Sequence, residues 1–355
     1  CTLPMRFIWL DQKDNGERWD QALERFPDAP YSLLYGWRRV YEEALRLPTY
    51  YLLAEERGEV QGVCPLVLMK GTWPGRPDFF ICLPYQTRSG LWAAHPEVRE
   101  GMLRALGQLA RERRVGTVEL RELDREEPSD GPGNREHVEM VLELPVDWKS
   151  YERKIAPRVR QMRRAREKGL EVRQGRDEKL LADFYRVFSL RMRELLFPVY
   201  PLSFFRKILE VFPSPSGLVV VYKGDEPLAG MLRLEFRDTV SAPYVAALQG
   251  AQGEFPNQLL YYEAIRQAWE AGFRFFSFCR SQVDSGTYQF KKQWQACPLP
   301  LRYNYPRVRP GRPVLSVAGA RQSLTYRVAE QVWPRLPLSW TQWLGSRLIR
   351  RLVIA

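Results

Sequence analysis

Apolar and polar residues follow a pattern that occurs twice along this chain of 355 residues. The stretches 50–71 and 217–236 each contain two apolar runs, separated by Arg-Gly-Glu in the first stretch and by Lys-Gly-Asp in the second. A glycine, Gly62 or Gly230, stands near the start of each second run. Two strand-like runs joined by a short glycine turn predict a β-hairpin in each stretch.

A second pattern follows each hairpin in the same order. Residues 96–123 and 256–281 both begin with proline, carry apolar residues at three-to-four spacing, and end in a short apolar run. Proline suits the first turn of a helix, so each stretch predicts a helix followed by a buried strand. The two strands end near equivalent arginines, Arg121 and Arg280. The sequence therefore predicts a duplicated α/β domain.

The repeat also sets the expected division of the chain. We place the boundary between the copies near residues 145–149. This gives a first domain over 1–147, a second over 148–310, and a basic amphipathic helical tail over 311–355.

The start of the second domain is strongly basic. Residues 156–170 predict a short helix with proline near its start, glycine at its end, and one apolar stripe made by Ile155, Val159 and Met162. The six cations of this segment are Arg158, Arg160, Arg163, Arg164, Arg166 and Lys168. The helix presents either an ordinary solvated face or a surface that binds phosphate or carboxylate, and the sequence does not decide between them. For the second interpretation, a surface that binds phosphate or carboxylate, we take Arg160 as the substrate-binding candidate.

The tail has a two-sided pattern over residues 337–355. Its apolar side is made by Trp340, Trp343, Leu344, Leu348 and Leu352, with arginines largely elsewhere. Tryptophan and arginine on one helix suit an anionic bilayer surface. Packing against the first domain explains the same pattern, and we favour packing.

The composition of the chain and the motifs that it lacks limit the kinds of partner and active site that we expect. The net charge of +12 and pI near 9.5 favour anionic partners. Five scattered cysteines without a CxxC pair disfavour zinc and disulfide frameworks. The chain contains no HExxH, GxSxG, P-loop or GxGxxG motif, and its two histidines disfavour a histidine-centred site. We find no signal peptide and no membrane-spanning run, so we expect a cytoplasmic protein, either soluble or peripheral at the inner face of the membrane.

Several short stretches resemble one family. They include YSLLYGWRRVY (31–41), LPYQTRSGLWA (83–93), FPVYPLSFF (197–205), PNQLLYYEAI and GTYQFKKQW. Together with the duplication they resemble FemAB-like transferases, in particular the subgroup associated with exopolysaccharide and PEP-CTERM systems. The resemblance implies two tandem GNAT-like domains, each a mixed sheet flanked by helices, with a C-terminal helical tail. Family members tend to have Asp and Gly where this chain has Ser277 and Cys279.

The resemblance also implies site residues. Phe290 and Lys291 match a Phe-Lys pair that faces the transfer site from a strand edge in the family. Lys291 would stabilise negative charge on the reacting carbonyl or on a donor phosphate, which makes it the catalytic candidate. Lys292 would face solvent, and Tyr288 ranks lower as a substrate contact. Arg280 would hold an acceptor carboxylate or phosphate.

Further substrate-binding candidates are Tyr85, Asn257 and Arg121. Tyr85 would line a groove between the domains. Asn257 follows the glycine-containing turn 249–258, whose backbone N–H groups suit a phosphate, although it also fits a plain helix cap. Arg121 is flanked by Glu119 and Glu122, and for these carboxylates a salt bridge with Arg121 is the favoured role over that of a general base.

These observations lead to one preferred function and two alternatives. The preferred function is an N-acyltransferase, or aminoacyl transferase, acting on an amino group of a cell-envelope glycan, peptidoglycan or lipid-linked precursor. Its anionic acyl donor would be aminoacyl-tRNA or acyl-CoA, its acceptor an amino-bearing glycan or peptide, and it would need no other cofactor. The alternatives are a non-catalytic scaffold that binds membrane or polymer during exopolysaccharide assembly and, ranked last, RNA binding alone.

Overall fold

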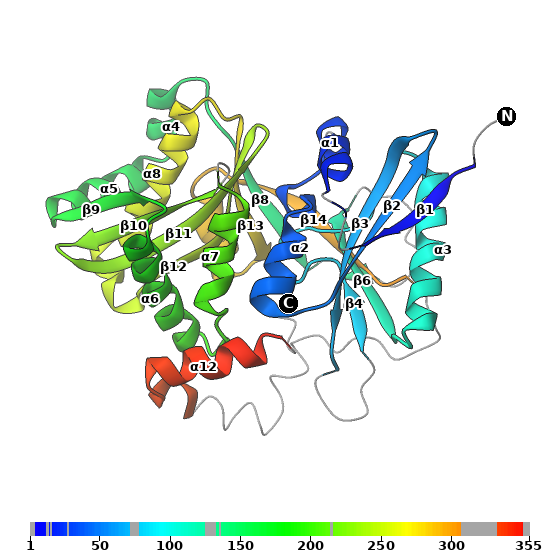
Figure 1. Cartoon of the computed structure of the whole chain (residues 1–355). Coiled ribbons are helices and arrows are strands. Elements are labelled where there is room, and N and C mark those ends of the chain that lie inside the picture. Colours follow the sequence, from blue (N-terminus) through cyan, green and yellow to red (C-terminus); the bar gives the residue numbers. More distant parts are fainter. Residues whose placement is uncertain are drawn as a thin grey trace. The chain divides into compact units, whose positions relative to one another are not determined.

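The computed structural model describes residues 4–11, 14, 16–26, 28–71, 78–124, 133–134, 136–213, 216–306 and 332–350. Its contacts divide into two compact units (Figure 1). Unit 1 comprises Cys1–Arg135, Pro300–Tyr326 and Arg347–Ala355, and unit 2 comprises Glu136–Leu299 and Arg327–Ser346. The units therefore divide the chain before residue 136, earlier than the boundary that the sequence suggests.

The sheet of unit 1 is built around the first predicted hairpin. Its strands run in the order β1 (Arg6–Leu10), β2 (Thr49–Glu56), β3 (Glu59–Met69), β4 (Phe79–Ile81), β6 (Thr117–Leu123) and β14 (Cys297–Asn304). Two shorter strands, β5 (Trp92–Ala93) and β7 (Gly133–Asn134), pair with β3 and β14. Neighbours in this order are antiparallel except β4 and β6, which are parallel. Arg57 and Gly58, between β2 and β3, both have positive φ, as the tight primed hairpin turns require.

Helices cover both faces of the unit 1 sheet. Helix α3 (Pro96–Glu112) packs Val98, Met102 and Leu106 onto buried residues of β2, β3, β4 and β6. The other face is covered by α1 (Glu17–Arg25), η1 (Tyr31–Leu33), α2 (Trp37–Arg39) and η2 (Val40–Ala44). Trp19 of α1, which is fully buried, lies 4.9 Å from the ring of Tyr51 on β2. The unit thus has the mixed sheet flanked by helices that the resemblance implies.

The sheet of unit 2 repeats this arrangement. Its strands run in the order β8 (His137–Glu143), β13 (Phe275–Gln282), β12 (Thr239–Ala247), β11 (Glu226–Phe236), β10 (Ser216–Lys223) and β9 (Leu170–Gly175). Again one pair, β12 and β13, is parallel and the others are antiparallel. In both units the parallel pair is joined through a helix, α3 in unit 1 and α8 (Pro256–Glu270) in unit 2. The predicted duplication and the α/β fold class are confirmed.

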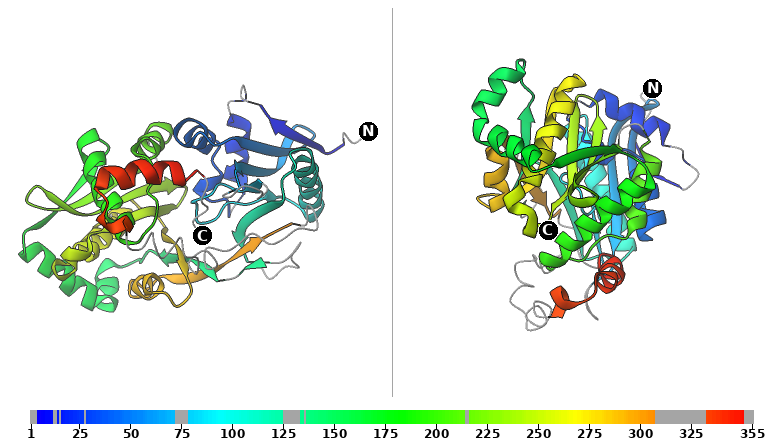
Figure 2. Two further views of the ribbon diagram at one scale, coloured as in Figure 1. Left: turned by 90° about the horizontal axis from the view of Figure 1, so that it is seen from below. Right: turned by 90° about the vertical axis from the view of Figure 1, so that its left-hand side faces the viewer.

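Helices also cover both faces of the unit 2 sheet (Figures 1 and 2). One face carries α4 (Trp148–Lys154), α5 (Ala156–Glu167) and α8, and the other carries α6 (Glu178–Glu194) and α7 (Leu202–Val211). The remaining elements of this part are η3 (Gln249–Glu254), α9 (Gly286–Lys292), η4 (Trp333–Arg335) and α12 (Leu338–Leu348). Gly230 of β11 lets α6 approach, because a Cβ there would lie 2.9 Å from the ring of Phe184. This glycine is therefore a packing requirement of the second hairpin.

The basic helix has the form that its pattern predicts. In α5 the predicted stripe of Ile155, Val159 and Met162 is buried, and Gly169 adopts the positive φ of a helix C-terminus. Of its cations, Arg158 is half-buried and the others are exposed. Arg166 pairs with Glu263 of α8, so part of this charge is used within unit 2.

The structure describes only part of the tail. Residues 311–331 and 351–355 of the tail lie outside the described residues. The described part of the tail, residues 332–350, contains η4 and α12. Helix α12 docks through Thr341 and Gly345, which are buried, whereas Trp340 and Trp343 of the predicted apolar side are 60% and 53% exposed. Gly345 permits this contact because a Cβ there would lie 2.6 Å from the backbone nitrogen of Val199. The apolar side of α12 is therefore not packed onto unit 2, and its packing against the first domain stays a prediction.

Candidate functional site

The candidate site lies in unit 2, where strands β12 and β13 separate. These parallel strands pair only over Thr239, Val240 and Ser241 of β12, opposite residues 275–277 of β13. Beyond this point β12 continues to Ala247 and β13 to Gln282 without pairing with each other. Backbone groups that leave a ladder need other partners, so the opening is a natural place for a polar ligand.

A bulge in β13 lies at this opening. The register of β13 against β8 shifts between Ser277 and Arg280. Within the bulge Cys279 has φ of 58°, a left-handed conformation that favours glycine. The family resemblance places a glycine here, and the observed backbone explains that preference. The bulge turns two carbonyl groups, those of Cys279 and Arg280, out of the ladder and toward Lys291.

Lys291 lies on a helix, and the expected strand edge is wrong. The segment 286–292 forms helix α9, which begins after Ser285, whose Oγ accepts a hydrogen bond from the backbone N–H of Tyr288. This serine cap favours a helix over residues 286–292, where the apolar residues show no clear helical period. On the helix, Lys291 is buried and the adjacent Lys292 is exposed. The expectation that Lys292 faces solvent is thus confirmed, but the reason is that neighbouring residues of a helix point in different directions.

The ammonium group of Lys291 is held by the bulge. Its Nζ donates to the carbonyl oxygens of Arg280 at 2.8 Å and Cys279 at 3.2 Å. Burial lowers the pKa of Lys291 from 10.5 to about 8, with Cys279 and Glu139 opposing this change. Near neutral pH the side chain is still mostly charged. Because an ammonium group has three donors, one more is available for a substrate oxygen.

A carboxylate lies beside this lysine, where sequence reasoning missed it. Ser277 Oγ donates to Glu139 Oε1 at 2.6 Å, and both residues are buried. The family resemblance places an acidic residue at position 277. Here Glu139 from the neighbouring strand β8 supplies the carboxylate on the same wall. The sequence signal for Glu139 was weak, because in VEMVLEL the two glutamates alternate with apolar residues, as they do in any half-buried strand.

Aromatic side chains form the support behind Lys291. Phe290 lies 5.4 Å from Tyr261 and 6.3 Å from Trp294, measured between ring centroids. Trp294 is fully buried, and burial raises the pKa of the Tyr261 hydroxyl. Tyr288 packs against the same core, with the ammonium of Lys292 5.5 Å from its ring centroid. Phe290 and Tyr288 are half-buried, so their role as substrate contacts stays a prediction.

The start of α8 offers a second feature of unit 2. Asn257 is the second residue of α8, and the N-cap is Phe255, which makes no side-chain cap. The simple expectation that Asn257 caps the helix is therefore wrong. Lys168 Nζ donates to the carbonyl of Gly253 at 2.8 Å, and Lys223 pairs with Glu254, so cations lie beside this turn. A phosphate-binding role for Asn257 and the turn stays a prediction.

Two further predicted residues of unit 2 lie apart in its structure. Arg280 is half-buried in the bulge of β13, where its carbonyl bonds to Lys291. Arg160 is exposed on α5, on the helix that packs against α8. Their proposed contacts with anionic substrate groups stay predictions.

In unit 1, Arg121 and Tyr85 have internal partners. Arg121 is 1% exposed, and its Nε donates to Glu119 Oε1 at 2.8 Å, which confirms the favoured salt bridge. Burial alone would lower the pKa of Arg121, but Glu119 and Tyr303 outweigh it and the pKa is raised. Tyr85 donates its hydroxyl hydrogen to the carbonyl of Ile349. Arg121 thus forms a salt bridge within unit 1, and substrate binding by Arg121 and Tyr85 stays a prediction.

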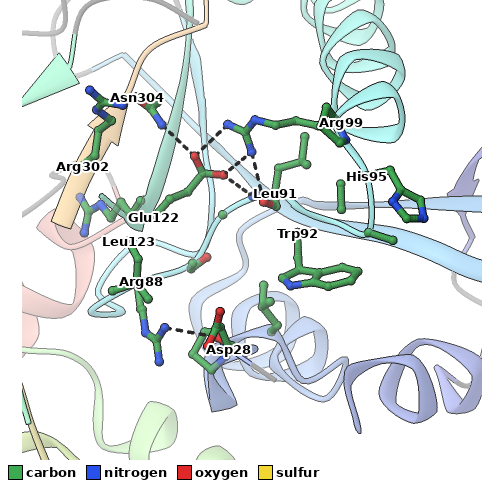
Figure 3. Close-up of a pocket in the computed structure, with 18 residues that line it drawn as sticks. Asp28, Arg88, Leu91, Trp92, His95, Arg99, Glu122, Leu123, Arg302 and Asn304 are labelled. Atoms are coloured by element: carbon green, nitrogen blue, oxygen red, sulfur yellow. Dashed lines mark hydrogen bonds and ion pairs between the residues drawn. The ribbon is translucent and has the colours of Figure 1, made fainter. Parts of the chain in front are cut away.

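A cavity of about 270 Å³ lies in unit 1, between the loop after β4 and the start of α3 (Figure 3). At its centre Glu122 forms a two-point ion pair with Arg99, at 3.0 and 2.9 Å. Asn304 donates to the same carboxylate at 2.8 Å. The expectation that Glu122 pairs with Arg121 is wrong, because successive residues of β6 point to opposite faces of the sheet. Arg88 and Arg302 also line the cavity, so with Arg99 at least three guanidinium groups contribute to its lining.

A family comparison agrees with this geometry. Residues 153–292 match the model of the acetyltransferase (GNAT) domain. These residues form a GNAT domain. The matched range includes the opening between β12 and β13, the bulge and Lys291 of this GNAT domain. The expectation of an acyltransferase-type domain is confirmed for this part of the chain. No curated protein matches the chain in sequence.

Solved structures extend the likeness to both units. The crystal structure of FemX has a TM-score of 0.61 at 14% identity, covering 86% of this chain and 98% of FemX. The C-terminal domain of a putative lysylphosphatidylglycerol synthetase from Agrobacterium fabrum has a TM-score of 0.57 at 11% identity, with 83% and 93% covered. A tandem GNAT protein from the clavulanic acid biosynthesis pathway has a TM-score of 0.50 at 10% identity, with 87% and 100% covered. The chain thus has the tandem GNAT fold of FemX, as the resemblance implied.

Proposed function

We propose that the chain is an N-acyltransferase that moves an acyl or aminoacyl group to an amino group of a cell-envelope glycan, peptidoglycan or lipid-linked precursor. The observation that carries the proposal is the buried ammonium of Lys291 at the strand opening of a GNAT domain. A charged hydrogen-bond donor such as this ammonium group stabilises negative charge much more strongly in a low-dielectric site than it would in water.

The reaction assigns a role to each group of the site. The acceptor amine attacks the carbonyl carbon of the donor, and the new C–N bond forms as the C–O or C–S bond to the donor breaks. The amine gives up one proton to solvent, and the leaving oxygen or sulfur of the donor takes up one proton, so that an amide and a free hydroxyl or thiol result. The Lys291 ammonium donates its remaining hydrogen bond to the carbonyl oxygen as that oxygen becomes negative. Glu139 favours the charged form of Lys291, because its carboxylate raises the pKa of that lysine.

Anionic parts of the substrates have two cationic regions available. In this proposal the donor, aminoacyl-tRNA or acyl-CoA, places phosphate near the start of α8, beside Lys168 and Lys223. The second cationic region is the unit 1 cavity, which is lined by Arg88 and Arg302 and suits an anionic ligand of that unit. No cofactor beyond the donor takes part, and we propose that the reaction occurs on the cytoplasmic side.

The test is a transfer assay with matched lysine variants. Labelled acetyl-CoA and charged tRNA serve as donors, and a nucleotide-linked muropeptide and an amino sugar polymer serve as acceptors. We expect the wild type to give product with at least one pair. Lys291→Met should lower the rate by about 10²- to 10³-fold, the usual effect of losing one such donor. Lys292→Met is the control and should retain the wild-type rate. Unchanged turnover in Lys291→Met would remove Lys291 from the mechanism.

A scaffold that binds membrane or polymer without catalysis is the second candidate. The exposed tryptophans of α12 favour it. The two candidates differ in the assay above, since a scaffold gives no product with any donor while its binding is insensitive to Lys291→Met.

A further inference from the structure

Helix α12 docks on unit 2 with its less apolar side. Thr341 is 2% exposed, and Gly345 lies one turn later against the backbone of Val199. Gln342 Nε2 donates to Ser189 Oγ of α6 at 3.1 Å. Arg193 of α6 donates to the carbonyl of Leu336, just before α12, at 3.1 Å. Small and polar groups thus fix the helix in place, which leaves its larger apolar side chains outward.

The outward side of α12 is strongly apolar. Trp340, Trp343 and Leu348 are 60%, 53% and 39% exposed, and Val332 shortly before the helix is 49% exposed. These four are half of the eight large exposed hydrophobic residues in the described part of the chain. Trp340 and Trp343 are three residues apart, so they are neighbours on one side of the helix. Such concentrated apolar exposure indicates an interaction surface.

Positive charge accompanies this apolar side. From residue 307 to the end, the sequence contains nine arginines, no lysine and one acidic residue, Glu330, so this stretch carries +8 of the net charge of +12. Residues 331–355 contain no acidic residue at all. Around α12 itself, Arg335 and Arg347 are exposed. The charge is therefore concentrated in the same short stretch of sequence as the exposed tryptophans.

Arginines also lie near one another at the end of α12. Burial, together with the positive charges of Arg46 and Arg347, lowers the pKa of Arg350. Neighbouring cations that lower a pKa in this way indicate a positive potential, which attracts an anionic surface. The three residues belong to unit 1.

We propose that α12, with Arg335 and Arg347, is an interfacial anchor that binds the surface of an anionic phospholipid bilayer. Tryptophan and leucine enter the boundary between headgroups and acyl chains, and arginine pairs with lipid phosphate. The helix lies in the membrane plane; among the described residues no helix is long and apolar enough to cross a bilayer. A nucleic acid would also pair with arginine, but a polyanion alone gives no reason for exposed Trp340 and Leu348. The proposal does not rest on the transferase function.

Co-sedimentation with vesicles tests the anchor. We expect the wild type to bind vesicles that contain phosphatidylglycerol and to bind pure phosphatidylcholine weakly. Trp340→Ser/Trp343→Ser should weaken binding at least about tenfold, because apolar area no longer leaves water. Arg335→Gln/Arg347→Gln should weaken it about 30-fold at low salt, since each arginine near an anionic surface contributes about fivefold. Val146→Ser, at a fully exposed apolar residue elsewhere, is the control and should bind like the wild type.

A second measurement uses the unaltered protein. Phospholipids brominated in the acyl chains should quench part of its tryptophan fluorescence, and the tryptophan variant should lose that quenching. Failure of the wild type to bind phosphatidylglycerol vesicles would overturn the proposal. So would a tryptophan variant that binds vesicles normally, and weaker binding of that variant to RNA would then identify a nucleic acid as the partner.

Discussion

The buried charge of Lys291 predicts a measurable dependence of stability on pH. In the native protein its pKa is about 8, whereas an ordinary lysine in the unfolded chain has 10.5. Between these values the unfolded state holds a proton that the native state has lost. The free energy of unfolding therefore rises with pH in this window, at about 1.4 kcal/mol per pH unit. Below pH 8 both states are protonated, and this contribution is constant and unfavourable.

The magnitude follows from the width of the window. A difference of about 2.5 pKa units corresponds to about 3 kcal/mol, of which roughly 2 to 3 kcal/mol should appear between pH 7 and pH 10. Lys291→Met removes the titrating group, so this rise should be missing from the variant. Urea unfolding followed by tryptophan fluorescence at several pH values gives the two curves, and their difference cancels the other titrating groups.

Lys292→Met is the matched control for this experiment. Lys292 is adjacent in sequence and on the same helix, but its side chain is exposed to water in the native protein. The control should follow the wild type across the pH range. Parallel curves for the wild type and Lys291→Met would refute the reasoning, because they would mean that Lys291 is solvated in the native protein.

Three other changes test separate parts of the structure. Arg99→Ala should lower the free energy of unfolding by about 1 to 3 kcal/mol, because it leaves the partly buried carboxylate of Glu122 without its ion pair; urea unfolding measures this, and an unchanged midpoint would show that the pair is weak. Gly345→Leu should release α12 from the backbone of Val199 and increase its cleavage in limited proteolysis, whereas unchanged protection would contradict the docked position. In a background lacking Cys1, Cys297 should be the fast-reacting thiol toward a thiol reagent in the native state, because the three other cysteines are buried; a fast phase that persists in Cys297→Ser would contradict their burial.

The sequence predicts the framework of the fold well where the signal is local. Both hairpins could be located because alternating apolar runs meet at a glycine turn, and Gly58 and Gly224 indeed have positive φ. Both crossover helices could be located from proline at their start and from their apolar period. The apolar side of α12 could be located from its spacing, but the side through which α12 docks on unit 2 could not, since a helix can dock through any side that fits its neighbour.

The candidate site could be predicted only in part, for physical reasons. Lys291 could be identified only through the family resemblance. The apolar residues of segment 286–292 show no clear helical period, and the Ser285 cap that starts its helix is a weak sequence signal. Glu139 lies on another strand, 138 residues from its partner Ser277. In the unit 1 cavity, Asn304 and Glu122 are 182 residues apart. Contacts at such separations depend on strand order, which no local pattern of residues contains.

The two copies of the fold differ at equivalent strand ends, β6 and β13. In β6 the ladder with β14 continues past Arg121, so the backbone is paired and the guanidinium is neutralised inside unit 1. In β13 the bulge interrupts the ladder, and the carbonyl of Arg280 needs a donor from elsewhere. A neutral amide could satisfy that carbonyl, but only a cation also brings charge to the strand opening. If Lys291 acts in transfer as we propose, Lys291→Gln should preserve folding better than transfer; equal losses of stability and transfer would contradict this.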